Sequence, residues 1–383
     1  MTTHSSSDRQ QCLDFLTSVC HTWLLKTNPI STPPGLNLAI LKKMAYYQGV
    51  ETILHDLIRQ DLLSKNNLPQ NLIDHWEKAY FSTLIQNTRF TDLLTQILSK
   101  TEEENLPIIA LKGMASTALL YKDLGLRPMA DIDLLCHTKD LRKLSDILHS
   151  LGFQRKGILQ AHHIAFHHSN LGILIELHFA LQYIVKDKKN LLARFWEHHH
   201  WAEIDDARLP ILSTEDQLIF ETAHILDHVY LVSLKHFLDF AGWLLNDKEE
   251  IDWDYLKSHL LQSGMQEDFV LISQVLSEFF QIPMNLPIQN DLPSKKIDDL
   301  KNTISTSLSN TGFIQSPLAA TRIKSYATLT QKAGFTLRKL FPPLPVIQST
   351  YNISSPISSL FSYPYHIYKT LLDFQSRKKR DEA

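Results

Sequence analysis

Apolar residues recur every three to four positions through the first hundred residues, which is the spacing of helices that bury one face. The first such pattern ends at residues 28–35, where three prolines and a glycine interrupt it. Further helical patterns cover residues 36–64 and 70–100. We therefore predict an N-terminal helical region over residues 1–104.

From Leu106 the pattern changes to short apolar runs with strand character, separated by helical stretches. A turn at residues 169–172 joins the last two runs. The predicted strands are 106–111, 130–136, 153–157, 163–168 and 172–178, with helices over 114–121 and 138–151. This order predicts a compact α/β core over residues 105–212.

Helical spacing returns after residue 212, where Ser213 and Thr214 precede two acidic residues and suit a helix start. The predicted helical stretches are 214–246, 253–262 and 266–280, which together make a helical domain over residues 213–282. Residues 283–383 are expected to be loop-rich and helical. Within them, the three prolines of residues 340–345 argue against regular structure, and residues 360–380 predict an aromatic-rich helix with a basic end.

Two aspartates stand out in the run Ala130–Cys136. Asp131 and Asp133 are two positions apart, so both project from the same side of a strand, whereas the residues that follow are apolar. Neighbouring carboxylates repel each other unless a cation lies between them. The pair therefore predicts a Mg²⁺ site for phosphoryl or nucleotidyl transfer.

Two basic residues lie close to this pair in the chain. Lys112 and Gly113 form a turn between a strand and a helix, where backbone N–H groups, a lysine charge and the absence of a side chain suit a phosphate. The alternative is an ordinary turn with a surface lysine. Arg127, four residues before Asp131, suits either a phosphate contact or a structural ion pair.

A third carboxylate interrupts an apolar strand at Glu176. Because a buried carboxylate without a partner is costly, we expect Glu176 to face a cation, a metal ion or an acidic cluster. His178 is two positions further and shares its face. The alternative is a strand edge with Glu176 in solvent.

Together these residues resemble a known family. Leu111-Lys112-Gly113, Tyr121, Arg127-Pro-Met-Ala-Asp131-Ile-Asp133 and Glu176-Leu-His178 are similar to the signature of the uncharacterised bacterial nucleotidyltransferases, within the DNA polymerase-beta-like superfamily. The similarity covers roughly residues 80–245. Lys112-Gly113 takes the place of the Gly-Ser that usually opens the first helix of the superfamily.

The resemblance implies an α+β fold, with a polymerase-beta-like α/β core flanked by helical regions. It also implies a two-metal mechanism with Mg²⁺, or Mn²⁺ in its place. Asp131, Asp133 and Glu176 would be catalytic residues and metal ligands, Glu176 acting as ligand or base. Lys112, Gly113 and Arg127 would bind the nucleotide.

Histidines are numerous, with 19 in the chain. For the runs His162-His163, His167-His168 and His198–His200 we expect surface or packing roles, because no cysteine ligands or regular spacing accompany them. His224 and His228 lie four apart, as on a zinc-binding helix, but lack the glutamate of that motif. With His178 they are candidates for the acceptor side of the site.

Composition narrows the class of protein. The net charge of −3 does not suggest general nucleic-acid binding, and three cysteines are too few for a disulfide framework. No signal peptide or membrane-spanning run is evident, so we expect a cytoplasmic location without a transmembrane segment.

The resulting hypothesis is an enzyme that transfers a nucleoside monophosphate from an NTP to a hydroxyl of a small-molecule, sugar, peptide or protein acceptor. Two alternatives stay open at this point. One is a toxin-like nucleotidyltransferase that acts on tRNA or protein. The other is a nucleotide-binding module without catalysis.

Overall fold

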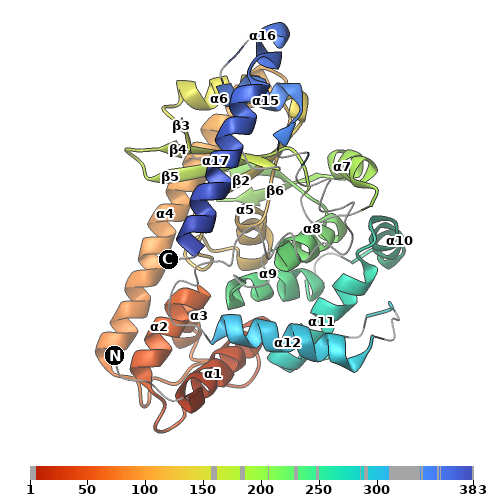
Figure 1. Ribbon diagram of the computed structural model, residues 1–383. Helices are drawn as coiled ribbons and strands as arrows, with labels where there is room; N and C mark the ends of the chain where they lie inside the picture. Colours follow the sequence, from red (N-terminus) through yellow and green to blue (C-terminus); the bar gives the residue numbers. More distant parts are fainter. Residues whose placement is uncertain are drawn as a thin grey trace. The chain divides into compact units, whose positions relative to one another are not determined.

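The computed structural model is drawn in Figure 1. It contains two compact units, each formed by three separate ranges of the chain. Unit 1 comprises residues 1–89, 115–129 and 212–314, and unit 2 comprises residues 90–114, 130–211 and 315–383. The residues that the structure describes are 6–156, 162–181, 186–205, 207–227, 232–246, 250–284, 286–288, 292–309, 337, 340–351, 353 and 355–381. Among them, no helix combines the length and the apolar character needed to cross a bilayer.

Unit 1 is helical. Its elements are α1 (Ser6–Leu25), α2 (Leu38–Gln48), α3 (Glu51–Arg59), the first part of α4 (Gln70–Glu103), the π-helical turn η1 (Thr117–Tyr121), α8 (Thr214–Asp227), α9 (Leu234–Leu244), α10 (Trp253–Ser263), α11 (Gln266–Phe280) and α12 (Ser294–Leu308). Its core contains the fully buried rings of Phe237, Phe240, Trp243 and Phe269. The helical spacing of residues 1–104 and 213–282 predicted helices, and the structure has helices in both ranges. α12 was not predicted as a separate helix.

Two of the predicted helical stretches are divided in the structure. The expected helix over residues 36–64 was wrong in its continuity, because Gly49 adopts φ 67° and ends α2 with its N–H bonded to the carbonyls of Ala45 and Tyr46. The stretch 214–246 forms α8 and α9, and residues 228–231 between them lie outside the described residues. The predicted start of α8 is confirmed, since the Asp216 backbone N–H donates to Ser213 Oγ at 3.2 Å.

Unit 2 is built on a seven-stranded mixed sheet. The strands are β1 (Ile108–Ala110), β2 (Ile132–Cys136), β3 (Gln154–Lys156), β4 (His163–His168), β5 (Ile173–His178), β6 (His200–Ile204) and β7 (Ala207–Ile211), in the spatial order β3-β4-β5-β2-β1-β7-β6. β2 runs parallel to β5 and antiparallel to β1. The expected α+β class is confirmed, whereas β6 and β7 were not identified from the sequence. The boundaries predicted for the four regions remain proposals.

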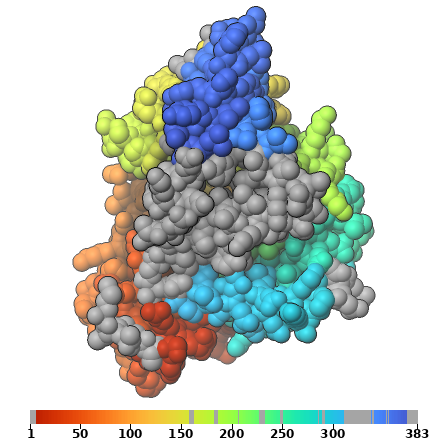
Figure 2. All heavy atoms as spheres, in the orientation of Figure 1, coloured from red at the N-terminus to blue at the C-terminus, as the bar shows by residue number. Residues whose placement is uncertain are grey.

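Among the described residues, the named helices of unit 2 are the end of α4, the start of the short α5 (Gly113–Ser116), α6 (Leu141–Ser150) after the 3₁₀ turn η2 (Thr138–Asp140), α7 (Lys188–Glu197), α15 (Leu344–Tyr351), α16 (Pro356–Leu360) and α17 (Tyr363–Asp381). α15 packs against α6, where the Ser145 and Ser349 hydroxyls are 2.6 Å apart. Figure 2 shows α17, in blue, at the surface, where Tyr365 and Tyr368 are exposed.

The proline run 340–345 corrects one expectation. Leu344 and Pro345 open α15 instead of remaining irregular. Proline is tolerated in the first turn of a helix, because the backbone N–H that it lacks would have no helical acceptor there.

Side chains from α3 and α4 hold the loop of residues 122–129 in unit 1. The buried amide of Asn87 donates to the carbonyl oxygens of Leu124 and Arg127 at 2.7 and 2.8 Å. Thr52 Oγ1 donates to the Leu126 carbonyl. Gly125 is required there, since a Cβ would lie 2.2 Å from the Tyr80 ring. The loop is thus positioned by side chains distant in sequence.

We predict that Asn87→Ala lowers the free energy of unfolding by about 2–3 kcal/mol, because two buried carbonyls lose a donor. Urea unfolding followed by circular dichroism measures the change. Thr88→Ala is the matched control, because Thr88 is exposed on the same helix and hydrogen-bonds only within it in the contacts described. Equal stability of the two variants would contradict the importance of Asn87.

Candidate functional site

The register of β2 and β5 brings two predicted carboxylates together in unit 2. Asp133 pairs directly with Glu176 across these parallel strands. His178 lies two positions beyond Glu176 and therefore on the same face of the sheet. The sheet thus places two acidic side chains and an imidazole next to one another.

Asp133 is the buried centre of this group, with only 4% of its surface exposed. Its Oδ1 accepts a hydrogen bond from Lys112 Nζ at 2.8 Å and lies 2.7 Å from His178 Nε2. Burial alone would raise the pKa of the Asp133 carboxyl, but the Lys112 charge and the His178 hydrogen bond outweigh it and hold the pKa well below its ordinary value. Asp133 is therefore a carboxylate at neutral pH.

Lys112 reaches Asp133 from the turn after β1. Its φ of 50° is the left-handed conformation, which costs a non-glycine residue about 1–2 kcal/mol. Burial would lower the pKa of its ammonium, yet the charges of Asp133, Glu176 and Asp131 raise it to about 12. The neighbouring Leu111 N–H donates to the Asp133 carbonyl at 3.0 Å. A strained turn thus holds a permanent cation against the carboxylates.

Glu176 lies between two histidines. Its Oε1 is 3.4 Å from His163 Nε2, and its Oε2 is 3.4 Å from His178 Nε2. Burial and the Asp133 charge raise the Glu176 pKa, but the hydrogen bond from His178 and the charges of both imidazoles bring it below its ordinary value. The pKa of His178 is lowered by burial and by Lys112, but the hydrogen bonds to Asp133 and Glu176 raise it overall.

Asp131 and Gly113 complete the predicted set in unit 2. Asp131 is half-buried just before β2, and its charge acts on the Lys112 ammonium. Gly113 is buried and begins α5. Lys112, Asp131, Asp133, Glu176 and His178 therefore interact in one region, while their catalytic and binding roles remain predictions.

The donor set suits a divalent cation. Ligand atoms of Asp133, Glu176 and His178 all lie within 4.8 Å of one another. Carboxylate oxygens are the ligands that Mg²⁺ and Mn²⁺ favour, whereas the imidazole is more typical of softer ions. The carboxylates thus fit the expected ion, and the lysine and histidine on Asp133 are the charges with which that ion would compete.

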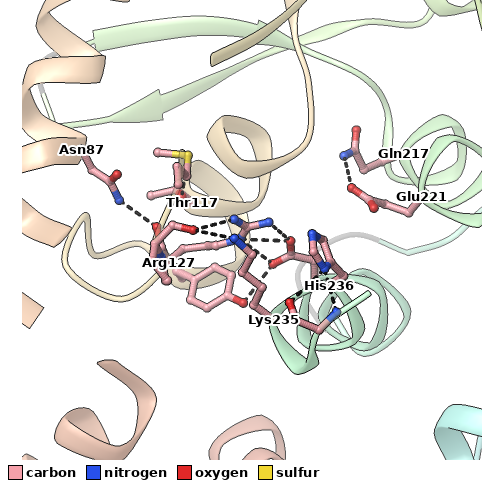
Figure 3. Close-up of polar contacts among 12 residues, drawn as sticks. Asn87, Thr117, Arg127, Gln217, Glu221, Lys235 and His236 are labelled. Carbon is pink, nitrogen blue, oxygen red and sulfur yellow. Dashed lines mark hydrogen bonds and ion pairs between the residues drawn. The ribbon is translucent and has the colours of Figure 1, made fainter. Parts of the chain in front are cut away.

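Arg127 belongs to unit 1, where it forms a buried ion pair with Asp239 of α9 (Figure 3). Its Nε and Nη2 donate to the carboxylate at 3.1 and 2.5 Å, and Nη1 donates to the Pro128 carbonyl at 2.9 Å. Tyr121 also donates to Asp239, at 2.9 Å. The described contacts favour the structural alternative for Arg127, and its nucleotide-binding role remains a prediction.

The three histidines predicted for the acceptor side, His178, His224 and His228, lie in different parts of the chain. His178 belongs to the cluster around Asp133 that was just described. His224 lies in α8 of unit 1, with its ring centroid 5.6 Å from that of His236. His228 lies outside the described residues. The acceptor assignment of these three remains a prediction.

Sequence reasoning missed His163 and the Arg127–Asp239 pairing. A usable signal existed for His163, because the predicted turn at residues 169–172 places His163 opposite His178 in the observed register. No local signal connects Arg127 with Asp239, which are 112 positions apart.

We predict that Lys112→Met lowers the free energy of unfolding by about 3 kcal/mol at pH 7, because Asp133 loses its buried cation. Lys143→Met should cost less than about 1 kcal/mol, since its pair with Glu104 is exposed. Because the folded pKa of Asp133 is depressed, the Lys112 contribution is fully present above the ordinary carboxyl value of 3.8, and it declines progressively as the pH falls from there through the lower pKa of the folded state. A cost of Lys112→Met that does not become smaller between pH 7 and pH 2 would contradict this pairing.

A double-mutant cycle tests the ion pair in unit 1. Arg127→Met alone should cost about 3–5 kcal/mol, because it leaves the Asp239 carboxylate buried without its cation. Arg127→Met combined with Asp239→Leu should recover most of this loss. Additive costs of the two substitutions, measured by urea unfolding, would show that the pair is not coupled.

Comparisons with known proteins identify the family of this chain. A family model described as "Uncharacterised nucleotidyltransferase" matches residues 38–281. No curated protein matches. One similar solved structure is the solution structure of the antibiotic-resistance factor ANT(2'')-Ia, with 16% sequence identity, coverage of 49% of this chain and 97% of that chain, and a TM-score of 0.34. A second is ANT(2'')-Ia in complex with adenylyl-2''-tobramycin, with 16% identity, coverage of 47% of this chain and 99% of that chain, and a TM-score of 0.33. A third is an antigenic nucleotidyltransferase-like protein from Paracoccidioides brasiliensis, with 16% identity, coverage of 46% of this chain and 91% of that chain, and a TM-score of 0.29.

The family match covers more than half of the chain. It includes Lys112, Asp131, Asp133, Glu176 and His178. The resemblance found in the sequence is thereby confirmed, and the chain belongs to the family of uncharacterised nucleotidyltransferases.

Proposed function

We propose that this protein is a Mg²⁺-dependent enzyme that transfers a nucleoside monophosphate from an NTP to a hydroxyl group of an acceptor. The observation that carries the proposal is the pairing of buried Asp133 with Glu176, beside Lys112, in a chain of this family. Two buried carboxylates that lie side by side repel each other, and a divalent cation bound between them removes that repulsion.

In the proposed reaction, the acceptor hydroxyl oxygen attacks the α-phosphorus of the NTP. A bond forms between that oxygen and phosphorus, the bond to the bridging oxygen breaks, and pyrophosphate leaves. Bound divalent ions would supply neutralisation of the phosphate charge. Asp131, Asp133 and Glu176 are the residues that would hold them.

Lys112 has a second proposed task. Its ammonium now neutralises Asp133, at a distance of 2.8 Å. If Asp131, Asp133 and Glu176 held a divalent ion, that ion would neutralise Asp133, and the lysine would be available to bind the phosphates together with the Gly113 backbone N–H. This exchange gives a reason for a lysine at a strained position, where its side chain serves two partners in turn.

Glu176 and His178 are the candidate proton acceptors. Both lie against Asp133, and the carboxyl pKa of Glu176 is held below its ordinary value, so Glu176 is ionised at neutral pH. Glu176 acts either as an ion ligand or as the base for the acceptor hydroxyl. A ligand role predicts that Glu176→Gln weakens Mg²⁺ binding, whereas a base role predicts unchanged Mg²⁺ binding with an altered pH profile.

The acceptor is proposed to be a small molecule, a sugar, a peptide or a protein. The first assay therefore includes all four NTPs and identifies both the acceptor class and the nucleotide base.

The test uses each NTP labelled in the α-phosphate, Mg²⁺, and a cell extract as the source of acceptors. We predict transfer of label to an extract component by the intact protein, and a loss of about a thousandfold for Asp131→Ala with Asp133→Ala, since several kcal/mol of charge stabilisation disappear. Asp146→Ala is the matched control, because this carboxylate of unit 2 is exposed on α6.

Three other outcomes would decide against the proposal. Transfer that persists in the double variant would show that the aspartates are not catalytic. Calorimetric binding of Mg²⁺-NTP without any transfer would support a nucleotide-binding module. Label found on tRNA, with growth arrest on expression that the double variant relieves, would support the toxin-like alternative.

A further inference from the structure

Three histidines gather at one end of β4 and β5, next to the carboxylates of unit 2. His163 lies directly opposite His178 in the antiparallel register, and His162 precedes it. The ring centroids are 4.3 Å apart for His162 and His163, 5.1 Å for His163 and His178, and 5.5 Å for His162 and His178. All three are half-buried or buried. We call these residues the histidine triad.

The triad offers nitrogen ligands at close range. His163 Nδ1 lies 2.8 Å from His162 Nε2, and one ligand atom from each of the three residues falls within 4.8 Å of the others. Tetrahedral zinc with Zn–N bonds of about 2.0–2.1 Å requires nitrogens about 3.4 Å apart. The nitrogens of the triad lie on both sides of this spacing, so the proposed site requires side-chain rotations that bring all three to one ion.

The outward contacts of two rings match those of metal-bound histidines. His178 Nε2 lies 2.7 Å from Asp133 Oδ1, and His163 Nε2 lies 3.4 Å from Glu176 Oε1. Histidine ligands commonly use one ring nitrogen for the metal and donate the other N–H to a carboxylate, which fixes the tautomer and the ring orientation. In both rings, Nδ1 is the nitrogen that this arrangement assigns to the ion.

The triad shares His178 with the cluster around Asp133, but its ligand atoms are imidazole nitrogens instead of carboxylate oxygens. Imidazole nitrogens favour first-row transition ions such as Zn²⁺, whereas Mg²⁺ favours oxygen.

We propose that His162, His163 and His178 form a binding site for one transition-metal ion of the Zn²⁺ type, adjacent to the carboxylate group and separate from the proposed Mg²⁺ site. Three protein nitrogens leave a fourth tetrahedral position for water or another ligand. The bound ion fixes the imidazoles that contact Asp133 and Glu176, and so fixes the two carboxylates. The proposal does not depend on nucleotidyl transfer.

The experiment titrates Zn²⁺ into the full-length, metal-stripped protein by calorimetry, with Mg²⁺ in large excess so that oxygen-ligand sites are occupied. We expect one tight equivalent of Zn²⁺. Titration with Co²⁺ should give the strong visible absorption of a four-coordinate ion, which reports the ligand geometry without any enzyme assay.

His162→Ala should weaken this equivalent at least about 100-fold, because even the loss of a group outside the ligand sphere costs 10–100-fold. His167→Ala is the matched control, since His167 lies on β4 four residues from His163, about 13 Å along the strand. His162→Gln, which retains size and polarity, serves as a second variant, and urea unfolding verifies that each variant is folded.

Wild-type protein without a tight Zn²⁺ equivalent in excess Mg²⁺ would overturn the proposal. So would wild-type Zn²⁺ affinity in folded His162→Ala or His162→Gln, or an equal loss in His167→Ala. The first result would show that the triad does not bind a metal, and the others would place the ion elsewhere.

Discussion

A carboxylate buried in a β-sheet is the constraint around which unit 2 is organised. Asp133 is almost entirely removed from solvent, and an unpaired charge in such a place would cost several kcal/mol. The sheet offsets this cost with a lysine from the preceding strand–helix turn and a histidine from the adjacent parallel strand. Lys112 balances the charge of Asp133, and Glu176 adds a second negative charge to the cluster. This second carboxylate is the reason why we propose a divalent ion here.

Unit 1 meets the same constraint in a different way. Arg127 and Asp239 are both buried, and the forked guanidinium satisfies the carboxylate with several hydrogen bonds. Tyr121 adds a further donor to the same carboxylate. In this pair the donors and acceptors are matched within the protein. In unit 2 the lysine is a point charge on a flexible stem, which can exchange partners more readily than a guanidinium fork. The contrast supports a structural role for the first cluster and a binding role for the second.

Much of the site could be predicted from the sequence, because its residues are encoded locally. Two aspartates at alternate positions, a charged residue inside an apolar strand and a histidine two positions later all reveal their face through the period of the strand. The helices within residues 6–103 and 214–280 were recognised for a similar reason, since their apolar spacing is regular.

Other features depend on contacts that no local pattern reports. Gly49 ends a helix whose apolar spacing continues past it, and Arg127 finds Asp239 far along the chain. β6 and β7 were missed because polar and apolar residues do not alternate regularly in His200–Ile204, and because Pro210 lies inside the second strand. His163 needed the register of a hairpin, not its own neighbours, to be recognised beside His178.

The central claim is that the Asp133 carboxylate exchanges Lys112 for a divalent ion when an NTP binds. A crystal structure of the protein with Mg²⁺ and a non-hydrolysable NTP tests this claim most directly. The account predicts Mg²⁺ bound to Asp131 and Asp133, with Lys112 Nζ moved from Asp133 to a phosphate oxygen. A nucleotide bound elsewhere, or bound while Lys112 still pairs with an Asp133 that holds no metal ion, would contradict it.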